Sequence, residues 1–198
     1  KELIEFEETT IQLEMLIYLK FREADLIIKN FYQFVRILHG EHYDWYFKIA
    51  ASARDKNNTG TRQNLIRKKI RDKIKNVSPI ICDLIKNSYK TQIRNSIAHS
   101  NYSFLGRQIH LNNYIENDPH SQIKTISFDE WIDIFHNTLV LYNEYIRMKN
   151  IIHKKYADIA IENGNTINIQ ITEKKGTWYT LPLKYRKECN DWRYKQNE

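Results

Sequence analysis

The chain has 198 residues, of which 41% are hydrophobic and 28% are charged, a balance typical of a globular protein and not of a disordered one. Its 5 glycines and 3 prolines favour long helices over a turn-rich β-sandwich. No apolar stretch is long enough to span a membrane and no signal peptide is recognisable, so we expect a soluble, cytoplasmic protein with no membrane partner. Because the first residue is Lys1 and not methionine, we expect the chain to be part of a longer protein.

Apolar residues three or four positions apart predict one amphipathic helix over residues 7–39, ended by Gly40. The aromatic-rich stretch 42–53 is also predicted to be helical, with a break at residues 57–60. Thr61 is expected to cap a short basic helix that runs to about residue 77.

Ser78 and Pro79 are an N-cap and a first helical residue, and predict a helix that ends near residues 99–101. Residues 102–126 are expected to form a loop or an irregular hairpin. Ser127 and Glu130 form a capping box that opens the last long helix. Strict alternation over residues 166–172, a turn at 173–176 and a second run at 177–183 predict a β-hairpin, followed by a polar arm.

These elements predict an all-α fold, a bundle of about four main helices with a small C-terminal β-hairpin. We expect residues 1–160 to form the bundle, and residues 161–198 to form a β-hairpin and polar tail appended to the same domain.

The formal net charge of the chain is +7, and residues 54–75 hold nine basic against two acidic residues, a difference equal to that whole charge. Such a concentration of positive charge favours a polyanionic partner through counterion release. A solvated helix face would explain it equally well. Within this stretch Arg67, Lys68, Lys69, Arg71 and Lys75 are predicted to form an RNA-facing stripe, while Ile66, Ile70 and Ile74 point to the core.

The segment Arg94-Asn95-x-x-x-His99 stands at the end of the mid-chain helix. Arginine holds phosphate oxygens bidentately, and histidine is the side chain best suited to move protons near neutral pH. Together they suit cleavage of a phosphodiester that carries its own 2′-hydroxyl nucleophile, which is RNA.

Two other arginine–histidine pairs have a similar spacing, Arg36 with His42 and Arg147 with His153. The first of these straddles the expected helix end at Gly40, and the second lies within a long helix, where residues six apart point to different sides. Only Arg94 is followed by asparagine and then by small residues that permit close packing.

The hexapeptide from Arg94 to His99 resembles the Arg-Asn-x-x-x-His signature of the HEPN superfamily. These are helical-bundle domains, and many are metal-independent endoribonucleases of toxin–antitoxin, abortive-infection and CRISPR-associated systems. The similarity of layout extends over residues 7–155. It implies a HEPN-like bundle that cuts RNA by 2′-hydroxyl attack, in a toxin or anti-phage defence setting, with no metal and no cofactor. An antitoxin or a sensor domain would be a further partner.

The resemblance implies that His99 is the general acid or base, that Arg94 stabilises charge on the phosphorane, and that Asn95 orients His99 or the phosphate. On a straight helix Arg94 and His99 point about 140° apart. Either the helix unwinds near its end, or two chains share one cleft. HEPN ribonucleases resemble the second case, which implies a homodimer with a composite active site.

Some HEPN toxins carry a modified tyrosine at the position of Asn101 in this chain, whereas the tyrosine here is Tyr102. Tyr102 could stack on a base of the RNA or anchor the loop. The aromatic run from Tyr43 to Phe47 is expected in the core or at a dimer interface, in preference to a base-stacking platform.

Other interpretations remain open at the level of sequence. Arg94 and Asn95 could cap the helix while His99 packs against the core. The domain could be a non-catalytic HEPN-type module that binds RNA or a partner protein, or a nucleic-acid-binding bundle in which the motif is accidental. Cys82 is expected to be a buried free thiol, and the remaining histidines have no metal-ligand spacing.

Overall fold

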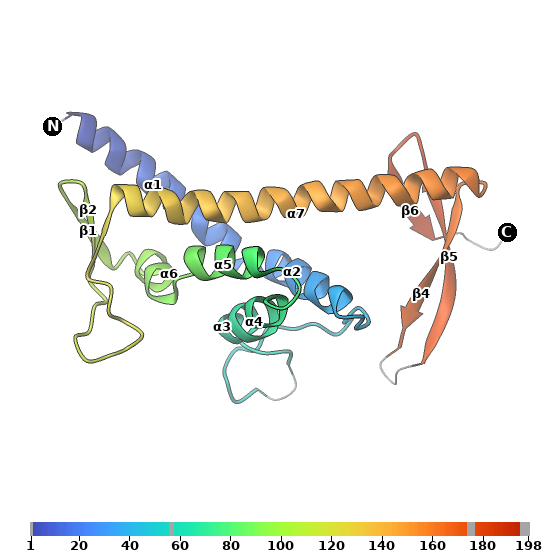
Figure 1. Cartoon of the computed structure of the whole chain (residues 1–198), viewed down its shortest axis with the longest axis horizontal. Helices are drawn as coiled ribbons and strands as arrows, with labels where there is room; N and C mark the ends of the chain where they lie inside the picture. The colour runs from blue at the N-terminus through green and yellow to red at the C-terminus, as the bar shows by residue number, and fades with distance from the viewer. Residues whose placement is uncertain (1, 56–57, 174–176, 195–198) are drawn as a thin grey trace. The chain divides into compact units, whose positions relative to one another are not determined.

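The computed structural model describes residues 2–55, 58–173 and 177–194 (Figure 1). The chain forms two compact units, an N-terminal unit of residues 1–142 and a C-terminal unit of residues 143–198. The helices and strands, in chain order, are α1 (Glu2–Glu23), α2 (Asp25–Leu38), α3 (Arg62–Asn64), the π-helix η1 (Leu65–Arg71), α4 (Asp72–Ile74), α5 (Pro79–Ser88), α6 (Thr91–Ala98), β1 (Tyr102–Leu105), β2 (Gln108–Leu111), β3 (Thr125–Ser127), α7 (Phe128–Glu162), β4 (Thr166–Thr172), β5 (Trp178–Arg186) and β6 (Asp191–Tyr194).

The expected all-α fold is wrong, because the structure contains two three-stranded antiparallel sheets, β1-β2-β3 and β4-β5-β6. The first sheet lies in the stretch expected to be a loop or irregular hairpin. Its strands are three or four residues long, too short for an alternating pattern to be read from the sequence. Ile109 and Leu111 of β2 are nonetheless buried, so this sheet contributes one wall of a core.

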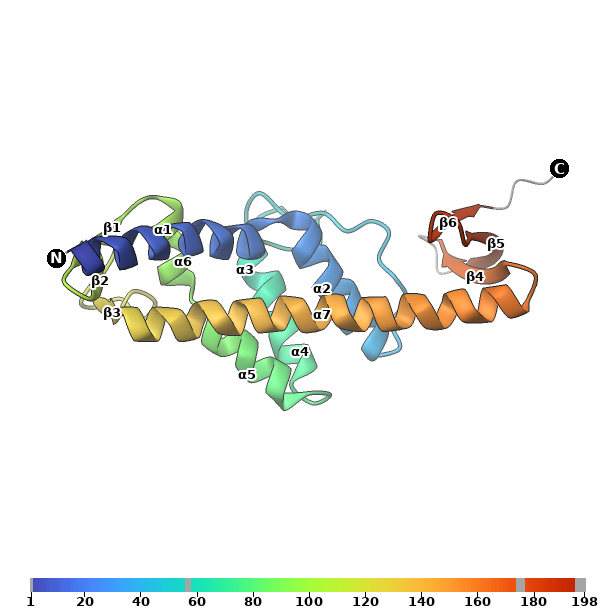
Figure 2. The same cartoon turned by 90° about the horizontal axis from the view of Figure 1, so that it is seen from above.

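The first core of the N-terminal unit lies between α1, α6, the β1-β2-β3 sheet and the start of α7. Tyr18 of α1 meets Trp131 of α7 edge to face, with ring centroids 5.4 Å apart, and α1 runs alongside the first half of α7 (Figure 2). The buried residues of this core are Ile11, Met15, Tyr18, Ile93, Ile97, Ile109, Leu111, Ile126, Phe128, Trp131 and Phe135.

A second core lies between α2, η1, α4, α5 and the part of α7 near Leu141. The helix predicted over residues 7–39 is broken at Ala24, whose backbone is extended. Because of this break, α1 packs into the first core while α2 turns its buried residues Ile28, Tyr32 and Val35 into the second. Ile66, Ile70 and Ile74 are buried there as predicted.

Two other helix predictions are wrong. The stretch 42–53 contains no helix; the Gln33 side chain holds it by donating to the Asp44 carbonyl at 2.6 Å and accepting from the Asp44 N–H at 2.8 Å. The helix predicted from Pro79 to residues 99–101 is interrupted at Tyr89 and Lys90. The hydroxyl of Tyr18 donates to the carbonyl of Ser88 at 3.0 Å. A side chain of α1 therefore supplies the hydrogen-bond donor for a carbonyl at the C-terminal end of α5.

Three of the predicted helix starts are confirmed, whereas the first helix begins at Glu2 and not at residue 7. Thr61 and Ser78 accept hydrogen bonds from main-chain N–H groups three residues onward. The Ser127 N–H donates to Glu130 Oε2 at 2.8 Å and the Glu130 N–H donates to Ser127 Oγ at 3.1 Å, which is a complete capping box.

In the C-terminal unit the predicted hairpin is confirmed, since β4 pairs with β5 from Thr166↔Lys184 to Thr172↔Trp178. The predicted turn residues 174–176, like Asn57 of the earlier break, lie outside the described residues. The polar arm expected at the C-terminus is wrong for residues 191–194, which form β6 against β5. Trp192 secures this strand by packing beside Tyr185, with ring centroids 4.9 Å apart. Within the described ranges, no helix is long and apolar enough to cross a membrane.

Candidate functional site

Helix α6, which carries the Arg-Asn-x-x-x-His segment, is fixed in place by two buried polar side chains. Gln92 donates to the carbonyl of Ile123 at 2.7 Å and accepts from the N–H of the same residue at 2.9 Å. The hydroxyl of Ser96 donates to the carbonyl of Asn101. Both side chains are 5% exposed or less, so the segment stands on a well-anchored helix.

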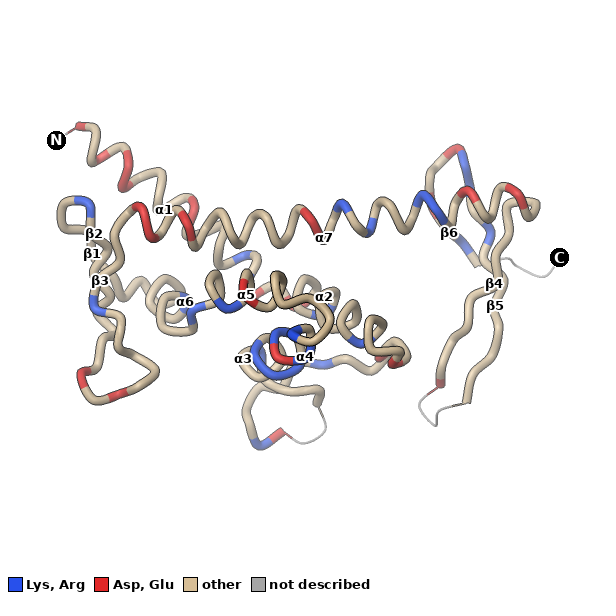
Figure 3. Tube along the Cα trace, viewed as in Figure 1, with Lys and Arg blue, Asp and Glu red and all other residues tan. Residues whose placement is uncertain are grey.

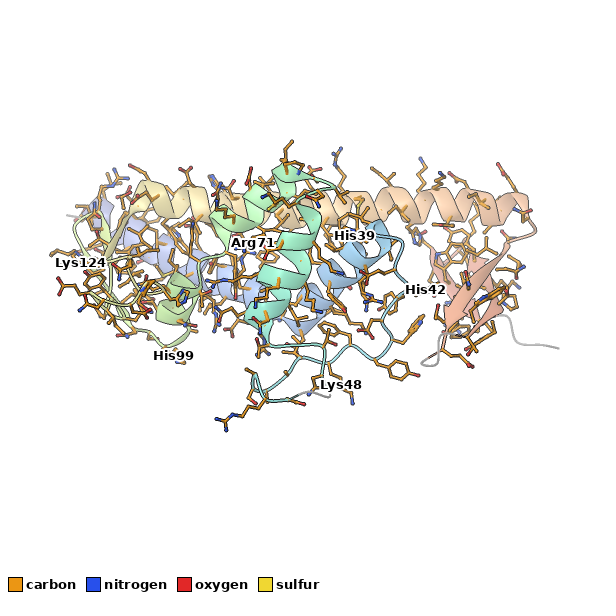
Figure 4. All side chains as sticks on the ribbon, turned by 60° about the horizontal axis from the view of Figure 1, so that its bottom comes forward. His39, His42, Lys48, Arg71, His99 and Lys124 are labelled. Atoms are coloured by element: carbon orange, nitrogen blue, oxygen red, sulfur yellow. The ribbon has the colours of Figure 1, made fainter. Side chains whose placement is uncertain are left out.

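The C-terminal end of α6 is a Schellman motif. The Asn101 N–H donates to the Ser96 carbonyl at 2.7 Å, and the Ser100 N–H donates to the Ile97 carbonyl at 3.1 Å. Ser100 takes the left-handed position with φ of 51°, where glycine is the usual residue. This turn holds His99 as the C-cap residue, with its side chain exposed (Figure 4).

Arg94 lies on another side of α6, where its Nη1 contacts Glu23 Oε1 at 3.1 Å, at the end of α1. The side chain of Arg94 is 20% exposed and that of Glu23 is 41% exposed, so the pair sits at the surface of the unit. The guanidinium keeps further N–H donors that take no partner within the described part of the chain, and such donors suit an oxyanion.

The three residues of the motif do not form one cluster within a single chain. In the described ranges no hydrogen bond joins the side chains of Arg94, Asn95 and His99, and the only link between Asn95 and His99 is a main-chain bond of 3.1 Å. α6 ends at Ala98, so the helix is regular up to the residue before His99, and Arg94 and His99 point about 140° apart around it. The alternative in which His99 packs against the core is wrong, since its side chain is exposed.

The two competing arginine–histidine pairs have structural partners. Arg36 binds the carbonyl of His42 at 2.9 Å and Glu41 at 2.8 Å, which ties the chain at the end of α2. In the C-terminal unit His153 hydrogen-bonds Asn190 at 2.9 Å and accepts from Trp192 at 3.4 Å. Neither histidine lies beside a free arginine, so these pairs make poorer candidate sites.

The predicted basic stripe lies mostly on η1, where Figure 3 shows a concentration of lysine and arginine. η1 is a π-helix, yet Ile66 and Ile70 are buried and Lys68 and Lys69 are exposed, so the faces expected from α-helical spacing are kept. Arg67 donates to Thr91 Oγ1 at 2.7 Å, and Arg71 contacts Asp72 at 2.7 Å. Lys68, Lys69 and Lys75 are exposed, and none of them forms an ion pair within the described residues.

The contact of Arg67 with Thr91 places η1 beside the first residue of α6, whereas His99 follows the last residue. An eight-residue helix is about 12 Å long. The basic segment and His99 therefore lie at opposite ends of one short element of the N-terminal unit.

Tyr102 begins β1 and packs against the first core, with its ring centroid 5.7 Å from that of Phe104. This arrangement fits the loop-anchoring role better than base stacking. Of the aromatic run, Phe47 packs against the second core, whereas Trp45 and Tyr46 are 48% and 56% exposed.

Two contacts of this site could not be read from the sequence, Glu23 beside Arg94 and Thr91 beside Arg67. The members of these pairs are 71 and 24 residues apart, and no local sequence pattern indicates such long-range contacts.

Cys82 is buried and unpaired, as predicted. The described residues contain no group of three or more histidine, cysteine, aspartate or glutamate side chains arranged to hold a metal ion.

Comparison with protein-family models, with curated proteins and with solved structures finds no match for this chain.

Proposed function

We propose that this protein is an endoribonuclease that cleaves RNA by attack of the 2′-hydroxyl on the adjacent phosphate, in a toxin or anti-phage defence setting. The observation that supports it is the exposed imidazole of His99, held at an anchored helix end five positions after Arg94. A general base must reach the proton it removes, and an exposed histidine on a fixed turn is accessible to an RNA backbone.

In this proposal His99 takes the proton of the 2′-hydroxyl as general base and then delivers it as general acid to the leaving 5′-oxygen. Arg94 uses its remaining N–H donors to stabilise the added negative charge on the phosphorane. The products carry a 2′,3′-cyclic phosphate and a 5′-hydroxyl. Side chains supply both the proton transfer and the charge stabilisation, so the proposed reaction proceeds with chelator present.

Because Arg94 and His99 point to different sides of α6, the proposed site takes Arg94 from one chain and His99 from a second copy. Asn95 is half-buried between them and would orient one of the two. The lysines at 68, 69 and 75 would hold the RNA backbone next to the first turn of α6.

The test is cleavage of a mixed RNA pool in excess EDTA with product ends mapped. Wild type is compared with His99→Ala, Arg94→Ala and the matched control His120→Ala, which removes another exposed histidine of the same unit. We expect cyclic-phosphate ends from wild type and the control and none from the other two. Mixing His99→Ala with Arg94→Ala should restore part of the activity, since one of the two composite sites would then be intact. Cleavage retained by both single variants would contradict the proposal.

A second function is favoured by the Arg94–Glu23 ion pair, which occupies the guanidinium in the free chain. The domain would then bind RNA, or a partner such as an antitoxin or a sensor domain, without chemistry. RNA bound equally well by wild type and His99→Ala, and left intact by both, would support this second function against the first.

A further inference from the structure

The β4 strand is an unprotected edge of the C-terminal sheet. The strand order is β4-β5-β6, and β4 reads Thr-Ile-Asn-Ile-Gln-Ile-Thr over residues 166–172. Natural edge strands are usually shortened, charged, interrupted by proline or covered, because an open edge pairs with other strands. β4 has seven residues with no charge and no proline, and no described strand lies on its outer side.

The direction of the main-chain groups on β4 follows from the two ends of its ladder with β5. The Tyr185 N–H donates to the Asn165 carbonyl at 2.9 Å, and the Glu173 N–H donates to the Thr177 carbonyl at 2.7 Å. In an antiparallel pair, hydrogen-bonded positions alternate along each strand. The isoleucines of β4 therefore turn their main-chain groups toward β5, and the four residues that turn theirs to the open edge are Thr166, Asn168, Gln170 and Thr172.

A groove of about 860 Å³ runs between the last turns of α7 and the C-terminal sheet. Ile167, Ile169 and Leu183 line it from the apolar face of the sheet, and Tyr156 and Ile159 line it from α7. Thr166, Asn168 and Gln170 also line it, so the groove reaches the residues of the open edge. Among the described residues, no main-chain hydrogen bond from the open side of β4 reaches another segment.

The sequence of β4 is palindromic in residue type about Ile169. Threonine stands at both ends, isoleucine stands two residues to either side of Ile169, and the two amide residues flank it directly. Two such strands run antiparallel about Ile169 pair Thr166 with Thr172, Ile167 with Ile171 and Asn168 with Gln170. Every pair joins like side chains on the same face. A register shifted by two residues would also pair isoleucine with isoleucine, but only the axis at Ile169 pairs all seven residues of the strand.

We propose that the open edge of β4 pairs with β4 of a second copy of this chain, antiparallel and with a twofold axis at Ile169, to form a continuous six-stranded sheet. The register agrees with the main-chain directions. The pairs Thr166–Thr172 and Asn168–Gln170 fall on the hydrogen-bonded positions of the new ladder, and each exchanges both of its N–H···O bonds.

The new pairing also extends an apolar surface. Ile167 and Ile169 lie on the same face as their cross-strand partners Leu183 and Leu181 on β5, and Ile171 lies beside Tyr179. The isoleucines and leucines are only half-buried, and Tyr179 is exposed. At non-hydrogen-bonded positions the side chains of facing strands approach most closely. The isoleucine stripes of the two copies therefore meet along the twofold axis, as an isologous interface requires.

Cysteine cross-linking tests the register in the full-length chain. In a Cys189→Ser background, which removes the exposed native thiol, the change Ile169→Cys puts two thiols at the axis, with Cα atoms about 4.5 Å apart and within disulfide range. The matched control Ile171→Cys puts them about 13 Å apart. We expect mild oxidation to give a covalent dimer with Ile169→Cys and none with Ile171→Cys. Equal cross-linking of both, or of neither, would overturn the proposal.

Paired charges test the same edge without cysteine. Asn168→Lys with Gln170→Lys sets lysine opposite lysine across the axis, whereas Asn168→Lys with Gln170→Glu sets lysine opposite glutamate twice. Light-scattering mass at matched concentration should show a dimer for wild type and the Lys/Glu variant and at least a tenfold weaker dimer for the Lys/Lys variant. Circular dichroism checks that both fold alike. A dimer that the Lys/Lys variant leaves unchanged would mean that another surface joins the copies. Both readouts are independent of RNA cleavage, so they separate this inference from the proposed function.

Discussion

Arg22 of α1 donates from Nη2 to Thr138 Oγ1 of α7 at 2.8 Å, and no carboxylate pairs with this guanidinium among the described residues. Arg22 is 7% exposed, and its Nε has no hydrogen-bond partner in that part of the chain. The charge is accommodated by the rings of Tyr18 and Tyr89, whose centroids lie 5.4 Å and 5.7 Å from Cζ. Burial lowers the pKa of Arg22 below its ordinary value, the direction expected for a desolvated cation.

The first prediction concerns this buried charge. Arg22→Met keeps most of the volume and removes the desolvation of the guanidinium, so we expect the free energy of unfolding to rise by about 1 kcal/mol. Arg22→Ala leaves a cavity and should lower it by about 2 kcal/mol. Urea titration of the three proteins measures both changes. A methionine variant as unstable as the alanine variant would mean that the contacts of the guanidinium with the two tyrosine rings and Thr138 stabilise the fold by more than its desolvation costs.

A second prediction concerns the ion pair between Arg94 and Glu23. If Arg94 contacts RNA phosphate, Glu23 competes for the guanidinium, and Glu23→Gln should tighten RNA binding several-fold. The matched control Glu144→Gln removes an exposed carboxylate that pairs with Arg147 instead. Fluorescence anisotropy with a labelled RNA measures both affinities. An equal effect of the two changes would indicate only the change in net charge.

The third prediction separates free from paired lysines. Lys68, Lys69 and Lys75 have no ion-pair partner among the described residues, whereas Lys73 contacts Glu41 at 2.5 Å. The triple change of the free lysines to alanine should weaken RNA binding and reduce the salt slope of log K by about 2. Lys73→Ala should leave the slope nearly unchanged. The result is read from affinities over a series of salt concentrations, and equal slopes for both variants would place the RNA elsewhere.

A fourth prediction follows from the left-handed backbone of Ser100, whose φ is 51°. A residue with a Cβ is strained at this position, and glycine is not, so Ser100→Gly should raise the free energy of unfolding by about 1 kcal/mol. Ser103→Gly, in the neighbouring strand β1, should lower it by a few tenths to about 1 kcal/mol. Thermal unfolding of the two variants distinguishes relief of strain from a general effect of glycine.

The fifth prediction is a pH dependence from the capping box of α7. The main-chain N–H of Ser127, and then its hydroxyl, donate to Glu130 and lower the pKa of that carboxyl below its ordinary value of 4.5. Because the folded pKa is the lower one, the contribution to stability is complete above pH 4.5 and is lost as the pH falls through the folded pKa.

We therefore expect Glu130→Gln to be less stable than wild type at pH 7, and the two proteins to converge near pH 3. Urea midpoints at both pH values measure this difference. In a Ser127→Ala background the stability difference caused by Glu130→Gln should change less between pH 7 and pH 3, because one donor to the carboxylate is missing. A constant difference at both pH values would contradict the assignment.

The sequence alone was sufficient to predict structural features that depend on neighbouring residues. The helix starts at Thr61, at Ser78–Pro79 and at Ser127 depend on side chains that bond to N–H groups three residues away, so a few adjacent residues contain all the information. The pairing of β4 with β5 is local in the same sense, since the alternation of isoleucine with polar residues determines which face is buried. The candidate motif itself was also visible as a pattern.

Tertiary structure alone decided where helices break and what Arg94 contacts. The break at Ala24 directs α1 and α2 into different cores, and the bond from Tyr18 to Ser88 spans 70 residues at the end of α5. Packing of an apolar face outweighs the small differences in helix propensity along a continuous pattern. The ion pair of Arg94 with Glu23 has the same origin. Periodicity shows which residues are buried, but the partners of those residues depend on how distant segments fold together.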